Sequence, residues 1–159
     1  MRRLLILFFV AGLSESFLHG QSSHLLLLLQ GDGAVTSSSG ANPLALKKAS
    51  FLPKDQMISV RPRSGIETLA SGFQFRFGAD TRFLLSADEI ELNEGSLMIR
   101  SRKITNSVVL SGPESKVRLN GSGCYLIEVE TNGGLKIVTV LGRLDLIDLE
   151  SGDAFDLLP

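Results

Sequence analysis

Hydrophobic and polar residues alternate along the segment from Phe73 to Arg100 (FQFRFGADTRFLLSADEIELNEGSLMIR). A period near two places successive side chains on opposite faces of a pleated strand. Phe73, Phe75 and Phe77 therefore share one face. The same alternation returns at Ile90 and Leu92 and again at Leu97 and Ile99, with a turn at Asn93-Glu94-Gly95 between the two runs. The segment predicts short strands separated by glycine-marked turns.

The rest of the chain repeats this unit, and turn signals recur roughly every 8–12 residues, as in a β-sandwich, barrel or β-helix. No strict internal repeat is present, so a regular solenoid is less favoured. We expect further strands at His24–Gln30, Met57–Val60, Ile66–Ala70, Ser107–Leu110, Lys116–Leu119, Tyr125–Val129, Leu135–Leu141 and Leu144–Leu146, and a closing strand after Ser151-Gly152-Asp153.

Three local predictions are specific enough to test. The leucine run HLLLLLQ at His24–Gln30 suits a strand that is buried on both faces. Residues 37–43 (SSSGANP) are typical of a surface loop. Asn120-Gly121-Ser122-Gly123 is expected to form the sharpest turn of the chain, because glycine tolerates positive φ.

Composition agrees with a single β domain. The 159 residues include 16 glycines, nine phenylalanines and no tryptophan, and no long amphipathic helical pattern is present. The formal net charge of −1 indicates no nucleic-acid partner. The single cysteine, Cys124, cannot form an internal disulfide.

The N-terminus has the layout of a secretory signal peptide. Two arginines precede the apolar run Leu4–Leu13 (LLILFFVAGL), and a polar stretch leads to Leu18-His19-Gly20. A transmembrane helix needs about 20 apolar residues, so this run is too short to span a bilayer comfortably. We expect cleavage after Gly20, which would change the net charge to −2. An uncleaved anchor, or an export signal that extends through Leu29, are the alternatives.

The order of these pieces resembles the FecR domain, a periplasmic sensor-regulator module of bacterial iron-uptake signalling. Three stretches carry the likeness: HLLLLLQGDGAV followed by PLALKKASFLPKDQMISV, then IELNEGSLMI, then SVVLSGPESKVRLNGSGCYLIEVETNGGLKIVTVLGRLDL. Together they cover nearly the whole chain after residue 20. The resemblance implies the all-β fold and a location in the cell envelope.

Two departures from the family pattern limit what it implies. Where the family has Gly-Thr-x-Phe, this chain has Gly121-Ser122-Gly123-Cys124-Tyr125, with one extra residue. The family's regulators also carry a cytoplasmic anti-sigma segment before a membrane helix, and here only two arginines precede the apolar run. The resemblance therefore does not carry over sigma-factor control.

Candidate metal ligands are few. The densest acidic group could offer oxygen ligands to Ca²⁺, but it has neither an EF-hand nor a D-x-D-x-D pattern, and a solvated strand face explains it better; its members are Asp80, Asp88, Glu89, Glu91 and Glu94. His19 lies in the leader. His24 has no second ligand at zinc-site spacing.

Candidate nucleophiles are equally poorly supported. Cys124 would need a positioned base, and His24 is the sole histidine after residue 20, so we expect Cys124 to be a small buried core residue. No G-x-S-x-G elbow is present. Asn120-Gly121-Ser122 matches the glycosylation sequon, which carries little weight in a chain of bacterial character. We assign no catalytic, cofactor-binding or metal-binding residue and expect no enzyme activity.

Charge is distributed unevenly along the chain. The middle is basic (Lys47, Lys48, Lys54, Arg61, Arg63, Arg76, Arg100, Arg102 and Lys103) and the tail is acidic (Asp145, Asp148, Glu150, Asp153 and Asp156). Scattered solvating charge, an acidic partner or anionic glycan, and head-to-tail association are all compatible with this polarity. Arg100, Arg102 and Lys103 also suit an edge strand that is protected against aggregation.

The sequence thus predicts an all-β, FecR-like β-sandwich or β-helix over residues 22–159 behind a signal peptide at residues 1–20. The expected function is a non-enzymatic periplasmic or secreted module that binds a protein or other envelope macromolecule, with a place in signal transduction. A structural or surface-matrix domain without a discrete ligand is the alternative. A glycan-acting enzyme, which needs two carboxylates facing across a cleft, is a third reading. We expect contact with a membrane only through an uncleaved N-terminal segment.

Overall fold

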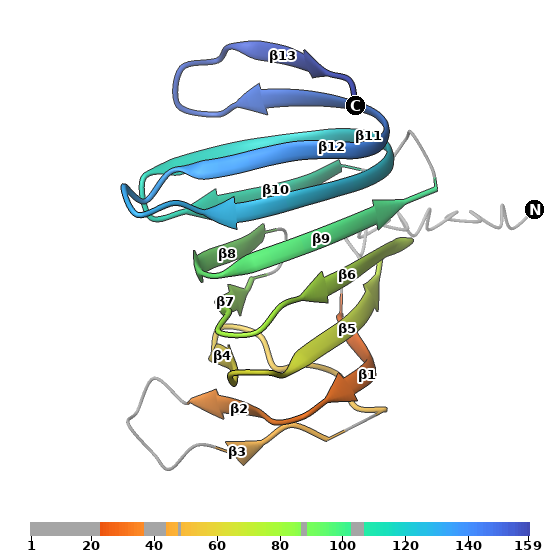
Figure 1. Ribbon diagram of the computed structural model, residues 1–159, viewed down its shortest axis with the longest axis vertical. Coiled ribbons are helices and arrows are strands. Elements are labelled where there is room, and N and C mark those ends of the chain that lie inside the picture. The colour runs from red at the N-terminus through yellow and green to blue at the C-terminus, as the bar shows by residue number, and fades with distance from the viewer. Residues whose placement is uncertain (1–22, 37–43, 48, 87–88, 103–106) are drawn as a thin grey trace, which may run out of the picture.

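The computed structural model describes residues 23–36, 44–47, 49–86, 89–102 and 107–159, and these residues contain β-strands and no helix. Figure 1 shows the strands stacked along the long axis, with the first strands at one end and the last at the other. The strands are β1 Leu25–Gln30, β2 Gly33–Thr36, β3 Leu44–Ala45, β4 Met57–Val60, β5 Gly65–Ala70, β6 Phe73–Phe77, β7 Arg82–Leu85, β8 Glu89–Glu94, β9 Ser96–Ser101, β10 Ser107–Gly112, β11 Ser115–Val129, β12 Leu135–Asp148 and β13 Ala154–Leu157.

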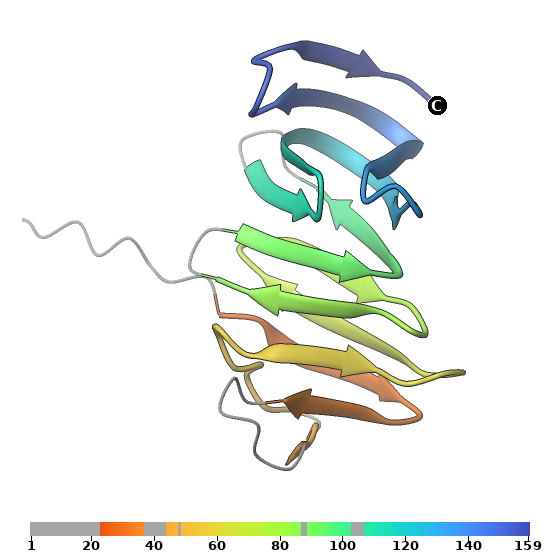
Figure 2. The same ribbon diagram turned by 90° about the vertical axis from the view of Figure 1, so that its left-hand side faces the viewer.

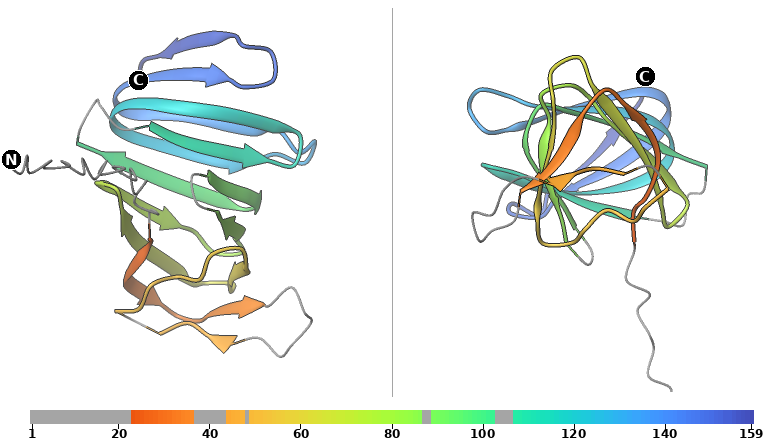
Figure 3. Two further views of the ribbon diagram at one scale, coloured as in Figure 1. Left: turned by 180° about the vertical axis from the view of Figure 1, so that it is seen from behind. Right: turned by 90° about the horizontal axis from the view of Figure 1, so that it is seen from below.

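The strands form one curled, mixed sheet. Its order is β1-β5-β6-β9-β11-β10-β8-β7-β4-β2-β3, and β12 and β13 follow β11 on a separate branch. All pairs are antiparallel except β8 with β10, which is parallel. We call β1-β5-β6-β9 the first arm and β10-β8-β7-β4-β2-β3 the second arm. Seen along the long axis, the two arms curl around a common interior (Figure 3).

Two long strands join the arms at the C-terminal end. The first half of β11 pairs with β10 of the second arm, and its second half pairs with β9 of the first arm. β12 pairs with β11 from Leu135 to Asp148, so it makes the same crossing in the opposite direction. Figure 2 shows these strands bending across the upper part of the molecule.

The core lies between the arms and is built by the alternation seen in the sequence. Phe73, Phe75 and Phe77 of β6 are buried, while Gln74 and Arg76 are not. The rings of Phe77 and Phe83 stack across the interior with centroids 3.7 Å apart, and both are fully buried. Because β6 and β7 belong to different arms, this aromatic pair packs one arm against the other.

The predicted all-β fold is confirmed, as are most of its elements. Ile90, Leu92, Leu97 and Ile99 are buried, and strands form at each segment for which they were predicted. Gly95, at φ 89°, makes the expected turn. β8 and β9 nevertheless do not pair with each other, because this turn takes the chain from the second arm to the first.

Two local predictions are wrong. The leucine strand is not buried on both faces, because the outer face of the first arm is solvent-exposed. Leu26 is fully buried, while Leu27 and Leu28, beside a bulge in β1, are about half exposed. Asn120–Gly123 is not a turn either. β11 runs through it without a break, and the glycines bend the strand from one arm to the other.

The expected signal peptide at residues 1–20 and the expected surface loop at residues 37–43 lie outside the described residues.

Candidate functional site

The C-terminal end of the sheet has free strand edges. Residues Leu135–Leu141 of β12 pair with β11 on one side, whereas β13 pairs only with residues 144–147 of β12. Neither the outer edge of Leu135–Leu141 nor that of β13 meets another strand among the described residues. We call these two edges together the open end. Unpaired strand edges are templates for the addition of another strand.

Apolar side chains lie exposed along the open end. Val140 and Leu141 of β12 are 54% and 65% exposed, and Val138 beside them is 42% exposed. Phe155 of β13 pairs with buried Leu146 and shares its inward-facing side of the strand, yet it is 50% exposed. Contiguous exposed apolar residues of this kind mark interaction sites.

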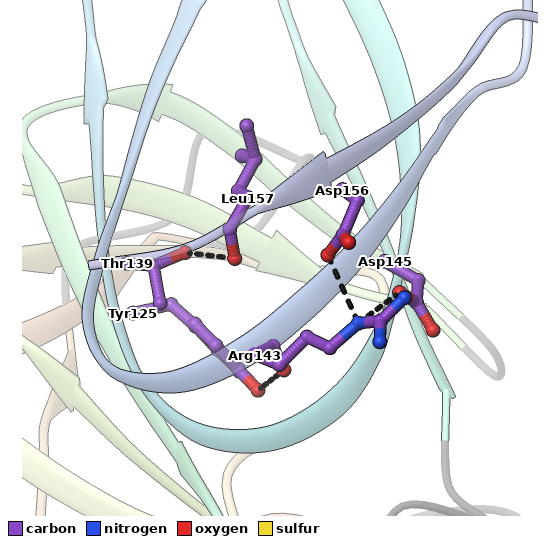
Figure 4. Close-up of polar contacts among 6 residues, drawn as sticks. All are labelled: Tyr125, Thr139, Arg143, Asp145, Asp156 and Leu157. Atoms are coloured by element: carbon purple, nitrogen blue, oxygen red, sulfur yellow. Dashed lines mark hydrogen bonds and ion pairs between the residues drawn. The ribbon is translucent and has the colours of Figure 1, made fainter.

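Specific hydrogen bonds hold the open end in shape (Figure 4). The hydroxyl group of Tyr125, from β11, donates to the carbonyl oxygen of Arg143 at 2.9 Å, across the bend of β12. The hydroxyl group of Thr139 donates to the carbonyl oxygen of Leu157 at 3.3 Å and so ties the last residue of β13 to β12. Burial, with the nearby charge of Asp145, raises the pKa of Tyr125, so its hydroxyl group remains a donor at neutral pH.

Arg143 forms ion pairs on the outer surface of the same strands. Its Nε lies 3.3 Å from Oδ1 of Asp145 and 3.0 Å from Oδ1 of Asp156 (Figure 4). The Arg143 side chain is 66% exposed, so solvent screens both pairs and each contributes little to stability. These ion pairs position the charged side chain of Arg143 at the open end and add little to the stability of the fold.

Glycines make the bend of the two long strands possible. A Cβ on Gly121 would overlap the carbonyl oxygen of Arg143, and one on Gly123 would overlap that of Leu141. Both glycines have positive φ, 149° and 153°, which side chains strongly disfavour. The close approach of β11 and β12 at the bend therefore requires glycine.

The N-terminal end, by contrast, is covered. The outer edge of β1 is hydrogen-bonded to the segment 49–52, through Leu26 N to Ser50 O at 2.9 Å and Leu52 N to His24 O at 2.8 Å. β3, the last strand of the second arm, has only two residues. We call this region the covered end. A covering segment and a very short edge strand are two ways in which proteins block strand addition.

His24 lies inside the covered end. Its side chain is buried, Nδ1 lies 3.1 Å from Oγ1 of Thr68, and its ring packs at 4.8 Å from Phe75. Burial, assisted by the positive charge of Lys54, lowers the pKa of His24 from 6.5 to about 4. The imidazole is therefore neutral at pH 7 and acts as a packed polar core group.

Lys54 supplies an unmatched positive charge beside this histidine. Its Nζ is buried and has no hydrogen-bond partner among the residues that the structure describes. Placing an ammonium group in such a site costs free energy, because the solvation that it loses is not replaced by a hydrogen bond.

The acidic residues singled out in the sequence are not brought together into a metal site. Asp88 lies outside the described residues, and the described ones contain no group of three or more potential metal ligands. Glu89 instead accepts a hydrogen bond from Lys116 Nζ at 2.5 Å. Burial alone would raise the pKa of Glu89, but the hydrogen bonds from Lys116 and Ser111 bring it below its usual value.

Two further predictions about individual residues are wrong. Cys124 is partly exposed and does not belong to the core. Tyr125 next to it points inward, so alternation along β11 directs Cys124 outward. Arg100 does not lie on an edge strand, because β9 pairs with β6 on one side and β11 on the other. Lys103 lies outside the described residues.

The sequence reasoning missed the exposed residues of the open end. A signal for them is present in the run Ile137-Val138-Thr139-Val140-Leu141, where apolar residues occupy both faces of one strand. A strand with one solvated face would carry polar residues at alternate positions. The excess apolar residues at Val138, Val140 and Leu141 could thus have indicated a contact surface.

Comparisons of the chain with protein-family models, with curated proteins and with solved structures find no match. The resemblance to the FecR domain therefore rests on the sequence motifs alone. No candidate for a membrane-spanning helix occurs among the residues that the structure describes.

Proposed function

We propose that this chain is a non-enzymatic, FecR-like exported module that binds a protein partner in the cell envelope by adding a strand of that partner to the open end. The observation that carries the proposal is the free edge of β12 at Leu135–Leu141 with its exposed apolar side chains. Backbone hydrogen bonds would supply affinity, and the apolar side chains would supply selectivity.

The chemistry of the partner strand follows from the edge. Val138 and Leu141 would lie beside residues of the added strand, so an extended segment with apolar residues at alternate positions fits best. Lys136 and Glu128 form an ion pair at the start of the edge, with Nζ and Oε2 3.7 Å apart. This pair favours a partner strand that is polar at its corresponding end.

The proposed envelope location and signalling role are supported by the sequence and not by the free edge of β12. The N-terminal sequence has the layout of an export signal, and the motif order resembles the FecR domain, whose members act in signalling. Sigma-factor control is not part of the proposal.

A structural or surface-matrix role is the second candidate. The observation that favours it is the opposite charge of the two ends of the molecule. Residues 130–159 contain six acidic and two basic residues, whereas residues 24–63 contain five basic and two acidic residues. Ends of opposite charge suit repeated association of identical modules.

The proposal is tested by pull-down from envelope extract. The bait is the wild-type protein, the double variant Val138→Glu/Leu141→Glu, or the control Leu69→Glu, which adds a charge at a 43% exposed leucine on β5, away from the open end. We expect a partner that wild type and the control retain and the double variant loses. Binding should also protect the amides of residues 135–141 from hydrogen exchange.

Retention of the same partner by all three baits would show that the free edge of β12 is not the binding site. Circular dichroism and urea unfolding of each bait establish that it is folded. If no bait retains a partner while all are folded, strand addition by another envelope protein is excluded for that extract, and the structural role gains.

A further inference from the structure

The charge of the molecule changes sign along its long axis. Among the described residues near the covered end, Lys47, Lys54, Arg61 and Arg63 stand against Asp32 and Asp55, which gives +2. The acidic residues near the open end are Glu130, Asp145, Asp148, Glu150, Asp153 and Asp156, against Lys136 and Arg143, which gives −4. Because the first and last strands lie at opposite ends (Figure 1), the two ends of the molecule carry opposite net charge.

Each end also carries large exposed apolar residues. At the covered end, Leu44 of β3 is 70% exposed, and Phe51 of the covering segment is 65% exposed. At the open end, Phe155 is half exposed, and Leu158 beyond it is 67% exposed. An apolar centre with a charged rim is the usual composition of a protein–protein interface. The two ends thus match each other in both features.

Two copies of the same end are not complementary in charge. A symmetric contact between two open ends would bring together two surfaces of charge −4, and a contact between two covered ends would bring together two surfaces of charge +2. Like charges that face each other across an interface oppose association. Charge therefore favours contact of an open end with a covered end.

We propose that copies of this chain associate head to tail, with the covered end of one copy seated on the open end of the next. This inference rests on the proposed function, in which the open end is the binding surface, and it names the partner as a second copy. Such a heterologous contact leaves one end of each kind free after every addition, so the product is an open linear assembly that grows with concentration.

The first test is the mass of the full chain in solution. Light scattering coupled to size exclusion, with any tag removed because the C-terminus lies at the open end, should show an average mass that rises with concentration and passes beyond that of a dimer. Raised salt should lower this mass, because screening weakens the charged rim. A mass that stays at the monomer value at low salt would overturn the proposal.

The second test separates the two ends. Phe51→Glu blocks the covered end, Phe155→Glu blocks the open end, and each variant alone should be monomeric. An equimolar mixture should form dimers and nothing larger, since only the native open end of the first and the native covered end of the second can join. Arg100→Glu, at an exposed position of β9 between the two ends, should assemble like wild type.

Alternative results each have a definite meaning. An assembly that Phe155→Glu abolishes and Phe51→Glu leaves intact would overturn the head-to-tail arrangement in favour of a symmetric contact. If Phe155→Glu impairs folding, as judged by circular dichroism, Leu158→Glu replaces it. Monomeric wild type that still captures a partner through the edge of β12 would refute self-association and leave the proposed function standing.

Discussion

The two ends of the molecule differ in whether their strand edges are covered or free to pair with another strand. At the covered end, the edge of β1 is hydrogen-bonded by residues 49–52, and the last strand of the other arm is reduced to two residues. At the open end, seven residues of β12 and the whole of β13 keep one edge without a strand partner among the described residues. One sheet can therefore be blocked against strand addition at one end and left available for it at the other.

The interiors of the two ends differ as well. The covered end encloses the buried polar pair of His24 and Thr68, with the amine of Lys54, which finds no hydrogen-bond partner in the described part of the chain. The open end keeps its ionic contacts on the surface, where Arg143 meets two aspartates. Buried polar groups respond strongly to pH, and exposed ion pairs contribute little. The stability of the covered end should thus depend on pH, whereas that of the open end should depend little on its ion pairs.

The largest effect on the free energy of unfolding is expected at Gly121, where β11 and β12 bend toward the open end. Gly121→Val would place a branched side chain at φ 149° against the carbonyl oxygen of Arg143, and we expect a loss of about 3 kcal/mol or more in the free energy of unfolding. The control is Gly152→Ala, at φ 81° with no atom within 4 Å, for which we expect about 1–2 kcal/mol. Urea unfolding measures both. Equal losses would mean that the crossing of β11 and β12 tolerates a side chain.

An intermediate effect is expected at the covered end as pH falls. The pKa of His24 is about 4 in the folded state, whereas the ordinary pKa of a solvated imidazole is 6.5, so the unfolded chain binds a proton first. The full contribution is present above pH 6.5, and about 3 kcal/mol is lost as pH falls from 6.5 to 4. Unfolding by urea at several pH values should show this loss in wild type and not in His24→Gln.

Lys54→Met provides the control for this pH dependence. It removes the charge that assists burial in lowering the pKa of His24, so that pKa should rise toward its ordinary value and the loss of stability on acidification should shrink. A proton NMR titration of the imidazole measures the pKa directly. Parallel stability curves for wild type and His24→Gln would show that the buried histidine does not govern the acid response of this end.

The smallest effect is expected from the surface ion pairs of the open end. Arg143→Gln removes both contacts to Asp145 and Asp156, and we expect the free energy of unfolding to change by no more than about 0.5 kcal/mol. Urea unfolding at low and raised salt measures this change. A larger loss that disappears at raised salt would assign the pairs a structural role and weaken the contrast between the ends.

The sequence predicts the inward and outward faces of this fold well, because alternation is a local property. Phe73, Phe75 and Phe77 illustrate this, since their burial follows from spacing alone. Neighbour relations are not local. Arg100 has the charge of an edge residue yet lies in a central strand, because the partners of β9 come from distant parts of the chain.

Glycine is ambiguous for a related reason. Gly133 lies in the hairpin turn between β11 and β12, whereas Gly121 bends a continuous strand. Both positions need positive φ, and the local sequence does not distinguish a reversal from a bend. The sequence reasoning did not predict the free edge of β12, because an edge is defined by the absence of a neighbouring strand. The apolar residues in excess of simple alternation, Val138 and Leu141, were the one sign of it in the sequence.

The position of β11 in the chain has a consequence for folding. In the described sheet, residues 115–129 form the strand that joins β9 to β10, and hence one arm to the other. Synthesis runs from the N-terminus, so about the first four fifths of the chain must emerge before this strand is complete. Until then, the edges of β9 and β10 are both unpaired and prone to aggregation. The protein therefore depends, for that interval, on being kept apart from other unfolded chains.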